Sequence, residues 1–243
     1  MTMEKLNRRQ FLGAAFAACC IPAIGKDSQS EFDKCKNDIL YFVDNYLEVD
    51  DPVYGKLKMS HQQQEYLQRI STAPDYFFCA KGRQIGISTA NNVFAYWKTT
   101  FFENQHVFIV EPSVRMVDAV CHMPRVSSSS FKMNDGCGIH VITPNIMMAH
   151  DLTDKNHTYI LDEFDFWDDE HSLDRLSQSH LNRFLANPLF AKELSPEQFG
   201  KFQSHMIVPS SICSFDNTFV TLLRNVDDSR RLVLPSPTTG LKA

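Results

Sequence analysis

Two short stretches of this chain combine residue types that can carry out phosphate chemistry. The first is residues 81–89, Lys-Gly-Arg-Gln-Ile-Gly-Ile-Ser-Thr, which join the apolar run 76–80 to a helix-like segment at 90–97. Small residues between a strand and a helix let backbone N–H groups converge on phosphate oxygens, and the helix N-terminus adds positive potential. Gly86 and Ser88 have the spacing at which a hydroxyl reaches a magnesium ion. The stretch therefore predicts a phosphate-binding loop.

This loop lacks the lysine that such loops usually carry just before the hydroxyl residue, because Ile87 stands in that position. Another cation must neutralise the phosphates. Lys81, whose long stem could fold back over them, is the first candidate, and Arg83 is the second. The alternative interpretation is an ordinary glycine-containing turn between a strand and a helix.

The second stretch is an apolar run at 158–161 that ends in two acids, Asp162 and Glu163. In ATPases of the additional-strand, catalytic-glutamate type, the Asp holds magnesium and the next Glu polarises the attacking water. A metal-holding acid, a water-orienting acid and a cationic clamp supply most of what phosphoryl transfer needs. Two alternatives are the start of an acidic surface loop and a two-metal nuclease centre. The apolar run before the acids favours the ATPase.

The pattern of apolar residues predicts that the elements that position these residues form an α/β fold. Short, continuous apolar runs suit buried strands of a parallel sheet covered on both faces. Helical spacing of apolar residues predicts helices between several of them, and a loop is expected around 50–52. The predicted strands are 76–80, 106–110, 139–142, 158–161 and 206–208, and the predicted helices outside the loop region are 31–47 and 59–70.

Composition excludes several other classes of protein. With 43% hydrophobic and 22% charged residues, the chain can bury a core, so disordered and disulfide-dominated classes are excluded. A formal charge of −5 gives no argument that overall basicity drives nucleic-acid binding. Seven cysteines without a CxxC pair argue against a disulfide framework and a zinc knuckle. We interpret them as reduced thiols of a cytosolic protein.

The first thirty residues are expected to form a separate apolar segment, either a helix or a signal. Arg8 and Arg9 precede an apolar run at 13–24, a pattern that resembles a twin-arginine export signal. The run is too short to span a membrane as a mature helix. Because ATP is supplied in the cytoplasm, we expect a cytoplasmic protein, with export as the alternative.

Taken together, residues 31–234 resemble the ATPase (motor) domain of the large terminase subunit of tailed bacteriophages, the DNA-packaging motor. Residues 83–88 are similar to the terminase Arg-Gln-x-Gly-x-Ser/Thr loop, and Lys81 matches the shifted lysine of deviant terminase loops. Residues 107–113 and 114–120 are similar to the second strand of the family and the helix after it. Asp162 and Glu163 resemble the metal and catalytic positions of the Walker B strand. The resemblance implies an α/β P-loop NTPase fold of the additional-strand, catalytic-glutamate class, with a central, mainly parallel sheet flanked by helices.

The resemblance also implies roles for individual residues, with ATP and Mg²⁺ as cofactors. Gln63 is expected to read the adenine edge through its amide, unless it is only a polar position on a helix face or Gln62 or Gln64 serves instead. Ser210 and Ser211 fall in a coupling segment that senses the γ-phosphate. Glu163 and Arg83 are the expected catalytic residues, and Ser88 and Asp162 the expected metal-binding residues. The nucleotide-binding set is Lys81, Gly82, Arg83, Gln84, Gly86, Ile87, Ser88, Thr89 and Gln63.

By the same resemblance, the partners would be double-stranded DNA, a portal protein and a small terminase subunit, in a homo-oligomeric ring in the host cytoplasm without stable membrane association. Residues 235–243 read as a tail, and no nuclease domain is expected after it. Two alternatives remain open. One is a catalytically impaired terminase-like remnant with a structural or regulatory role, which Ile87 and the missing nuclease favour. The other is a helicase-like, DNA-dependent ATPase.

Overall fold

The centre of the molecule is a sheet of parallel strands. The computed structural model describes residues 28–51, 55–120, 125–147, 154–164, 203–212 and 218–235, with positions 150, 152 and 196. In this part of the chain, six strands pair in the order β6-β4-β7-β8-β3-β9, and every neighbouring pair is parallel. They are β3 (Tyr76–Lys81), β4 (His106–Val110), β6 (Gly138–Ile142), β7 (His157–Leu161), β8 (His205–Ser211) and β9 (Arg231–Leu234).

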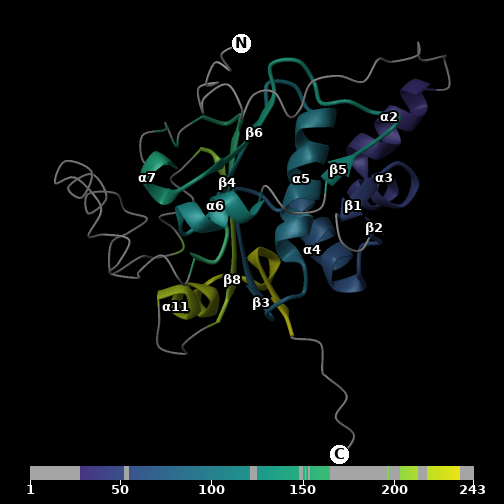
Figure 1. Cartoon of the computed structure of the whole chain (residues 1–243). Helices are drawn as coiled ribbons and strands as arrows, with labels where there is room; N and C mark the ends of the chain where they lie inside the picture. Colours follow the sequence, from purple (N-terminus) through teal and green to yellow (C-terminus); the bar gives the residue numbers. More distant parts are fainter. Residues whose placement is uncertain are drawn as a thin grey trace, which may run out of the picture.

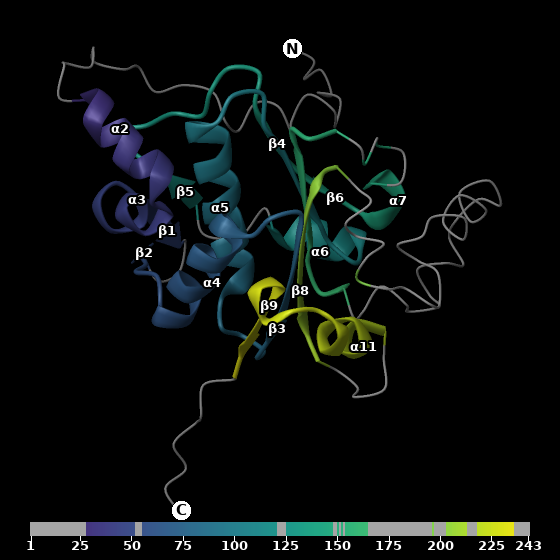
Figure 2. The same ribbon diagram turned by 180° about the vertical axis from the view of Figure 1, so that it is seen from behind.

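Helices cover both faces of this sheet (Figure 1). One face carries α2 (Ser28–Asn37), α3 (Ile39–Asn45), α4 (His61–Thr72) and α5 (Ile87–Phe101); the other carries α6 (Val114–Val120), α7 (Pro144–Met147) and α11 (Thr218–Asn225). The view from behind shows the same two layers on exchanged sides (Figure 2). A 3-10 helix, η3 (Asp228–Arg230), leads from α11 into β9. The structure is thus α/β, as the apolar runs predict.

The continuous apolar runs divide their side chains between two separate cores. Successive side chains of a strand point to opposite faces, so Phe77 and Cys79 of β3 pack under α4 and α5, whereas Phe78 and Ala80 pack with α11. All four are buried. Burial on both faces explains why these strands show no polar alternation.

The predicted strands and helices are mostly confirmed, with one strand added to the parallel sheet. All five predicted strands are present, and the helix at 114–120 has the predicted bounds. The helix predicted at 31–47 is wrong as a single element, because Asp38 ends α2 and caps α3 by accepting the N–H groups of Leu40 and Tyr41. The edge strand β9 had not been predicted.

A second, small sheet occupies positions for which no strand was predicted. Strand β1 (Glu48–Asp51) pairs antiparallel with β2 (Gly55–Lys56) and with β5 (Arg125–Ser127). The loop expected around 50–52 is therefore wrong for the residues of β1. Charged residues in a short strand give little hydrophobic pattern, and only Val49 of β1 is buried.

Most of the two terminal segments lies outside the described residues. Of the predicted segment 1–30, only 28–30 lie within the described residues, where they begin α2. Of the predicted tail 235–243, only Pro235 is described. No helix in the described part of the chain has both the length and the apolar composition needed to cross a bilayer.

Candidate functional site

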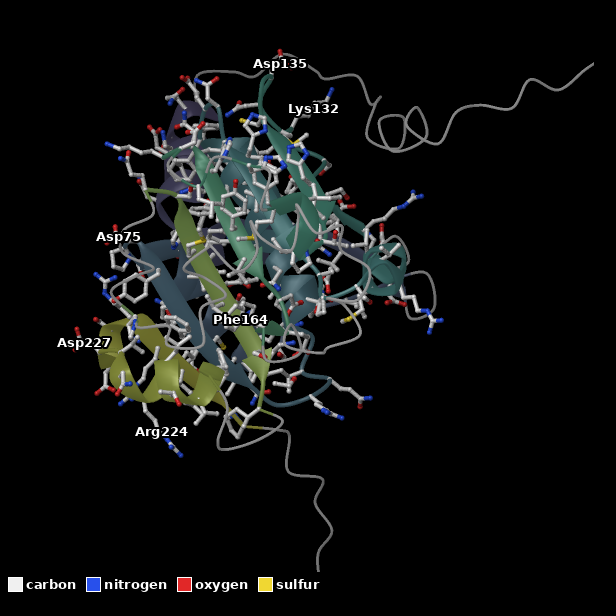
Figure 3. The ribbon with its side chains drawn as sticks, turned by 90° about the vertical axis from the view of Figure 1, so that its left-hand side faces the viewer. Asp75, Lys132, Asp135, Phe164, Arg224 and Asp227 are labelled. Atoms are coloured by element: carbon white, nitrogen blue, oxygen red, sulfur yellow. The ribbon has the colours of Figure 1, made fainter. Side chains whose placement is uncertain are left out.

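The parallel sheet brings the two predicted stretches together at the carboxyl ends of its strands. In the strand register, Lys81 at the end of β3 lies opposite Ser211 at the end of β8. The strand β7 ends one position before Asp162, whose N–H donates to the carbonyl of Val110 at the end of β4 (3.0 Å). In Figure 3, Asp135, which precedes β6, lies at the top of the molecule, and Phe164, just after the acid pair, lies well below it. The carboxyl edge of a parallel sheet is where ligands bind in open α/β folds.

The Lys81 ammonium group lies against both acids. Its Nζ is 2.7 Å from Oε1 of Glu163 and 3.3 Å from Oδ1 of Asp162, and only 7% of its side chain is exposed. Burial alone would lower the pKa of Lys81, but the charges and hydrogen bonds of Asp162 and Glu163 outweigh it, and the pKa is raised. The amine is therefore held as a cation within the acid pair.

The loop hydroxyl and the first acid are in direct contact. Ser88 Oγ donates to Oδ2 of Asp162 at 2.8 Å, across 74 positions of sequence. On the other carboxylate oxygen, Oδ1 accepts the N–H of Glu163 at 3.0 Å. The side chain of Asp162 is 1% exposed. The two residues predicted to bind metal thus lie side by side.

Glu163 has an unusual backbone conformation and is held by β8. Its φ of 49° lies in the left-handed region, which is uncommon for residues other than glycine, asparagine and aspartate. Ser211 donates its N–H to Oε2 of Glu163 (2.9 Å) and its Oγ–H to Oε1 (3.2 Å). Of the two predicted coupling residues, Ser211 reaches the acid, whereas the Oγ of buried Ser210 donates to the Ser211 carbonyl (3.3 Å). Strained residues of this kind cluster at functional sites.

The loop itself turns through a left-handed glycine. Gly86 has φ 76° and precedes α5 without a side-chain cap, so the first N–H groups of α5 have no capping side chain. Gln84 also has a positive φ, 61°. At the start of the loop, the Gly82 N–H donates to the Leu234 carbonyl of β9 (2.8 Å), which anchors the loop to the sheet edge. Thr89 lies half-buried in the first turn of α5.

The Gln63 amide contacts this loop from helix α4. Its Oε1 accepts the Ser60 N–H at 2.7 Å, which completes a capping box, and its Nε2 donates to the Gly86 carbonyl at 2.8 Å. A Cβ atom on Gly86 would lie 2.4 Å from that Nε2. Both ends of the amide are therefore engaged by backbone groups, and its reading of adenine stays a prediction.

The position of the usual loop lysine is part of the core. Ile87 is 2% exposed and packs in the cluster under α4 and α5. Arg83, in contrast, is exposed in the loop. Of the two cations considered from the sequence, Lys81 is the one that lies against Asp162 and Glu163.

Three residues at this site had not been predicted. Asn91 donates from Nδ2 to Oδ2 of Asp162 (3.3 Å), and its Oδ1 accepts the hydroxyl of Tyr66 (2.7 Å). Asn91 lies three positions after Ser88, on the same helix face, which was the available signal. Glu111 follows β4 and is 2% exposed. Burial first, then the charges of Asp162 and Glu163, raise the pKa of Glu111 to about 8.

The donor set suits a magnesium ion that is held mainly by a substrate. No group of three or more His, Cys, Asp or Glu in the described ranges is arranged to bind a metal. Mg²⁺ is usually held by one or two carboxylates together with substrate phosphates and water, rather than by a cage of protein ligands. The Ser88 hydroxyl beside the Asp162 carboxylate fits that pattern.

Comparisons of the sequence with models of known protein families and with curated proteins give no match.

Proposed function

We propose that this protein binds ATP with Mg²⁺ at the carboxyl edge of its sheet and hydrolyses it. The observation that carries the proposal is the 2.8 Å hydrogen bond from Ser88 to Asp162, with Lys81 on the other oxygen of the same carboxylate. A loop hydroxyl, a buried acid and a buried amine, which come from three elements, meet at one helix N-terminus. The strand order supports the same class, because β8 lies between β3 and β7, an added strand between the loop strand and the acidic strand.

Each residue has a distinct part in this reaction. The N–H groups of the loop and of the start of α5 would bind the phosphate oxygens, and Lys81 would neutralise their charge. Ser88 and Asp162 would hold Mg²⁺, which supplies charge stabilisation on the phosphates when bound. Glu163 would orient the water and accept its proton as the water oxygen attacks the γ-phosphorus and the bond to the β–γ bridging oxygen breaks.

This mechanism requires Lys81 to change partners. Its ammonium group neutralises Glu163 at 2.7 Å, and an acid paired in this way is a poor acceptor for a water proton. Triphosphate oxygens would compete for Lys81 and release Glu163 to the water. Ser211 would then keep Glu163 in place through its N–H and Oγ.

We further propose, from the resemblance to terminase motor domains, that hydrolysis moves double-stranded DNA into a capsid in the cytoplasm of the host cell. The assembly would be a homo-oligomeric ring that contacts a portal protein and a small terminase subunit. Phosphate-backbone contacts would make DNA binding independent of sequence and strongly sensitive to salt. The second candidate is a catalytically impaired remnant, which the burial of Ile87 at the usual lysine position favours.

Phosphate release by the purified chain separates these two functions. We expect Mg²⁺-dependent release from ATP that double-stranded DNA increases and added salt reduces. Absence of both ATP binding and phosphate release, with and without DNA, would leave only the remnant. Strand displacement without any capsid would instead favour a helicase-like ATPase.

A further inference from the structure

A buried pair of side chains links helix α4 to the acid that is proposed to hold magnesium. Tyr66 of α4 donates its hydroxyl to Oδ1 of Asn91 at 2.7 Å, and Asn91 Nδ2 donates to Oδ2 of Asp162 at 3.3 Å. Tyr66 and Asn91 are both 0% exposed. Three elements, α4, α5 and the turn after β7, are joined by this chain of hydrogen bonds.

The direction of the hydrogen bonds is set by the Asp162 carboxylate, which only accepts. The Asn91 NH₂ group therefore faces Asp162, and the Asn91 carbonyl oxygen accepts the hydroxyl of Tyr66. Burial raises the pKa of this hydroxyl well above 10, so the hydroxyl keeps the proton that it donates. Buried polar groups are costly unless they are paired, and this pairing orients the Asn91 amide in one way.

Asn91 differs from the other side chains that contact Asp162. Lys81 and Ser88 also hold this carboxylate, but both would turn toward the phosphates and the ion when substrate binds. Asn91 is enclosed on the core side of the site and makes its other hydrogen bond to Tyr66. Its contact with Asp162 can persist in the loaded site.

We propose that Asn91, oriented by Tyr66, is a positioning residue that fixes the Asp162 carboxylate for Mg²⁺. This inference rests on the proposed ATPase function. A carboxylate held by a buried donor keeps one oxygen aimed at the ion, whereas a carboxylate without that donor rotates. Removing a side chain that hydrogen-bonds to a metal ligand commonly lowers metal affinity or activity by about 10-fold to 100-fold.

The test compares Asn91→Leu with Asn92→Leu, the same change at the next position of α5. The side chain of Asn92 is half-buried. The affinity for a fluorescent ADP analogue is measured in EDTA and across a Mg²⁺ series, with the wild-type chain alongside. We expect Asn91→Leu to need about 10-fold to 100-fold more Mg²⁺ for tight binding. Its affinity in EDTA, and both affinities of Asn92→Leu, should stay near those of the wild type.

Tyr66→Phe keeps the test decisive if Asn91→Leu does not fold, because it removes only the hydroxyl. We expect a smaller rise in the Mg²⁺ requirement, and the same order of variants when Mn²⁺ binding in the presence of ADP is followed by electron paramagnetic resonance. An unchanged metal requirement in Tyr66→Phe and in any folded Asn91→Leu would overturn the proposal. So would an equal loss of affinity in EDTA and in Mg²⁺, which a purely structural role predicts. A wild-type chain that binds no nucleotide would overturn the proposed function itself, and this inference with it.

Discussion

The Nζ atom of Lys81 lies 2.7 Å from Oε1 of Glu163, although the two residues are 82 positions apart in the sequence. The amine proposed to hold phosphates and the acid proposed to orient water therefore neutralise each other. Removing one member of a buried ion pair leaves the other charge without compensation. A bound triphosphate would offer the amine new partners and free the acid for catalysis.

Lys81→Ala should weaken ATP binding more than Arg83→Ala does. A hydrogen bond to a charged group contributes about 1.5–3 kcal/mol, which corresponds to a loss of about 10-fold to 100-fold in affinity. Arg83 is exposed in the loop, where charge interactions are screened. Titration with a fluorescent ATP analogue measures both affinities, and thermal melting checks that each variant folds. The reverse ranking would transfer the clamp to Arg83.

Glu163→Gln should preserve nucleotide binding and reduce turnover by about 10²-fold to 10⁴-fold, the usual contribution of a positioned proton acceptor. The glutamine can still accept the Ser211 N–H but cannot take a proton from water. Phosphate release under single-turnover conditions measures the effect. Asp154→Asn is a suitable control, because Asp154 lies before β7, at the opposite edge of the sheet. Turnover equal to that of the wild type would remove Glu163 from the mechanism.

Glu111→Gln should change how stability depends on pH. The folded state raises the pKa of Glu111 from 4.5 to about 8, by burial first and then by the charges of Asp162 and Glu163. The stability that this protonated acid contributes is complete below the unfolded pKa and is lost as pH rises through about 8. The melting temperature of the wild type should therefore fall more than that of Glu111→Gln between about pH 5 and about pH 9. Parallel curves would contradict this, and Glu103→Gln, at an exposed position, gives the reference.

Gly86→Ala should destabilise the loop for two separable reasons. The φ of 76° costs a residue with a Cβ about 1–2 kcal/mol, and the new Cβ would meet Gln63 Nε2 at 2.4 Å. In a double-mutant cycle by denaturant unfolding, Gln63→Ala should relieve the second effect alone. The double variant should thus lose less stability than the two single losses added together. Additive losses would mean that the loop moves away from Gln63 without cost.

Local pattern was sufficient to predict the sheet and the acid pair. The strands before Lys81 and Asp162 are apolar on both faces, and two acids that directly follow such a strand stand out in the sequence. The edge strand β9 is short, with Val233 61% exposed, so its pattern was too weak to predict. The break between α2 and α3 depends on one side chain, Asp38, which caps a helix in a stretch whose apolar spacing continues across it.

The site residues that were not predicted depend on contacts far apart in the sequence. In the sequence, Asn91 is one polar position on a helix. Its two hydrogen-bond partners come from other elements, Tyr66 from α4 and Asp162 from the turn after β7. Glu111 follows an ordinary buried strand, and its place beside the acids follows from the pairing of β4 with β7. The hydrogen bond from the Gln63 amide to the Gly86 carbonyl likewise needs the loop to be folded against α4. The spacing of residues in the sequence does not predict these contacts.

A structure of the full chain with a non-hydrolysable ATP analogue and Mg²⁺ would show whether Lys81 leaves Glu163 for the phosphates. We expect the triphosphate against the loop and the start of α5, with Lys81 Nζ moved from Glu163 to the phosphate oxygens and the ion between Ser88 and Asp162. A triphosphate bound away from the loop, with the ion pair of Lys81 and Glu163 intact, would contradict it.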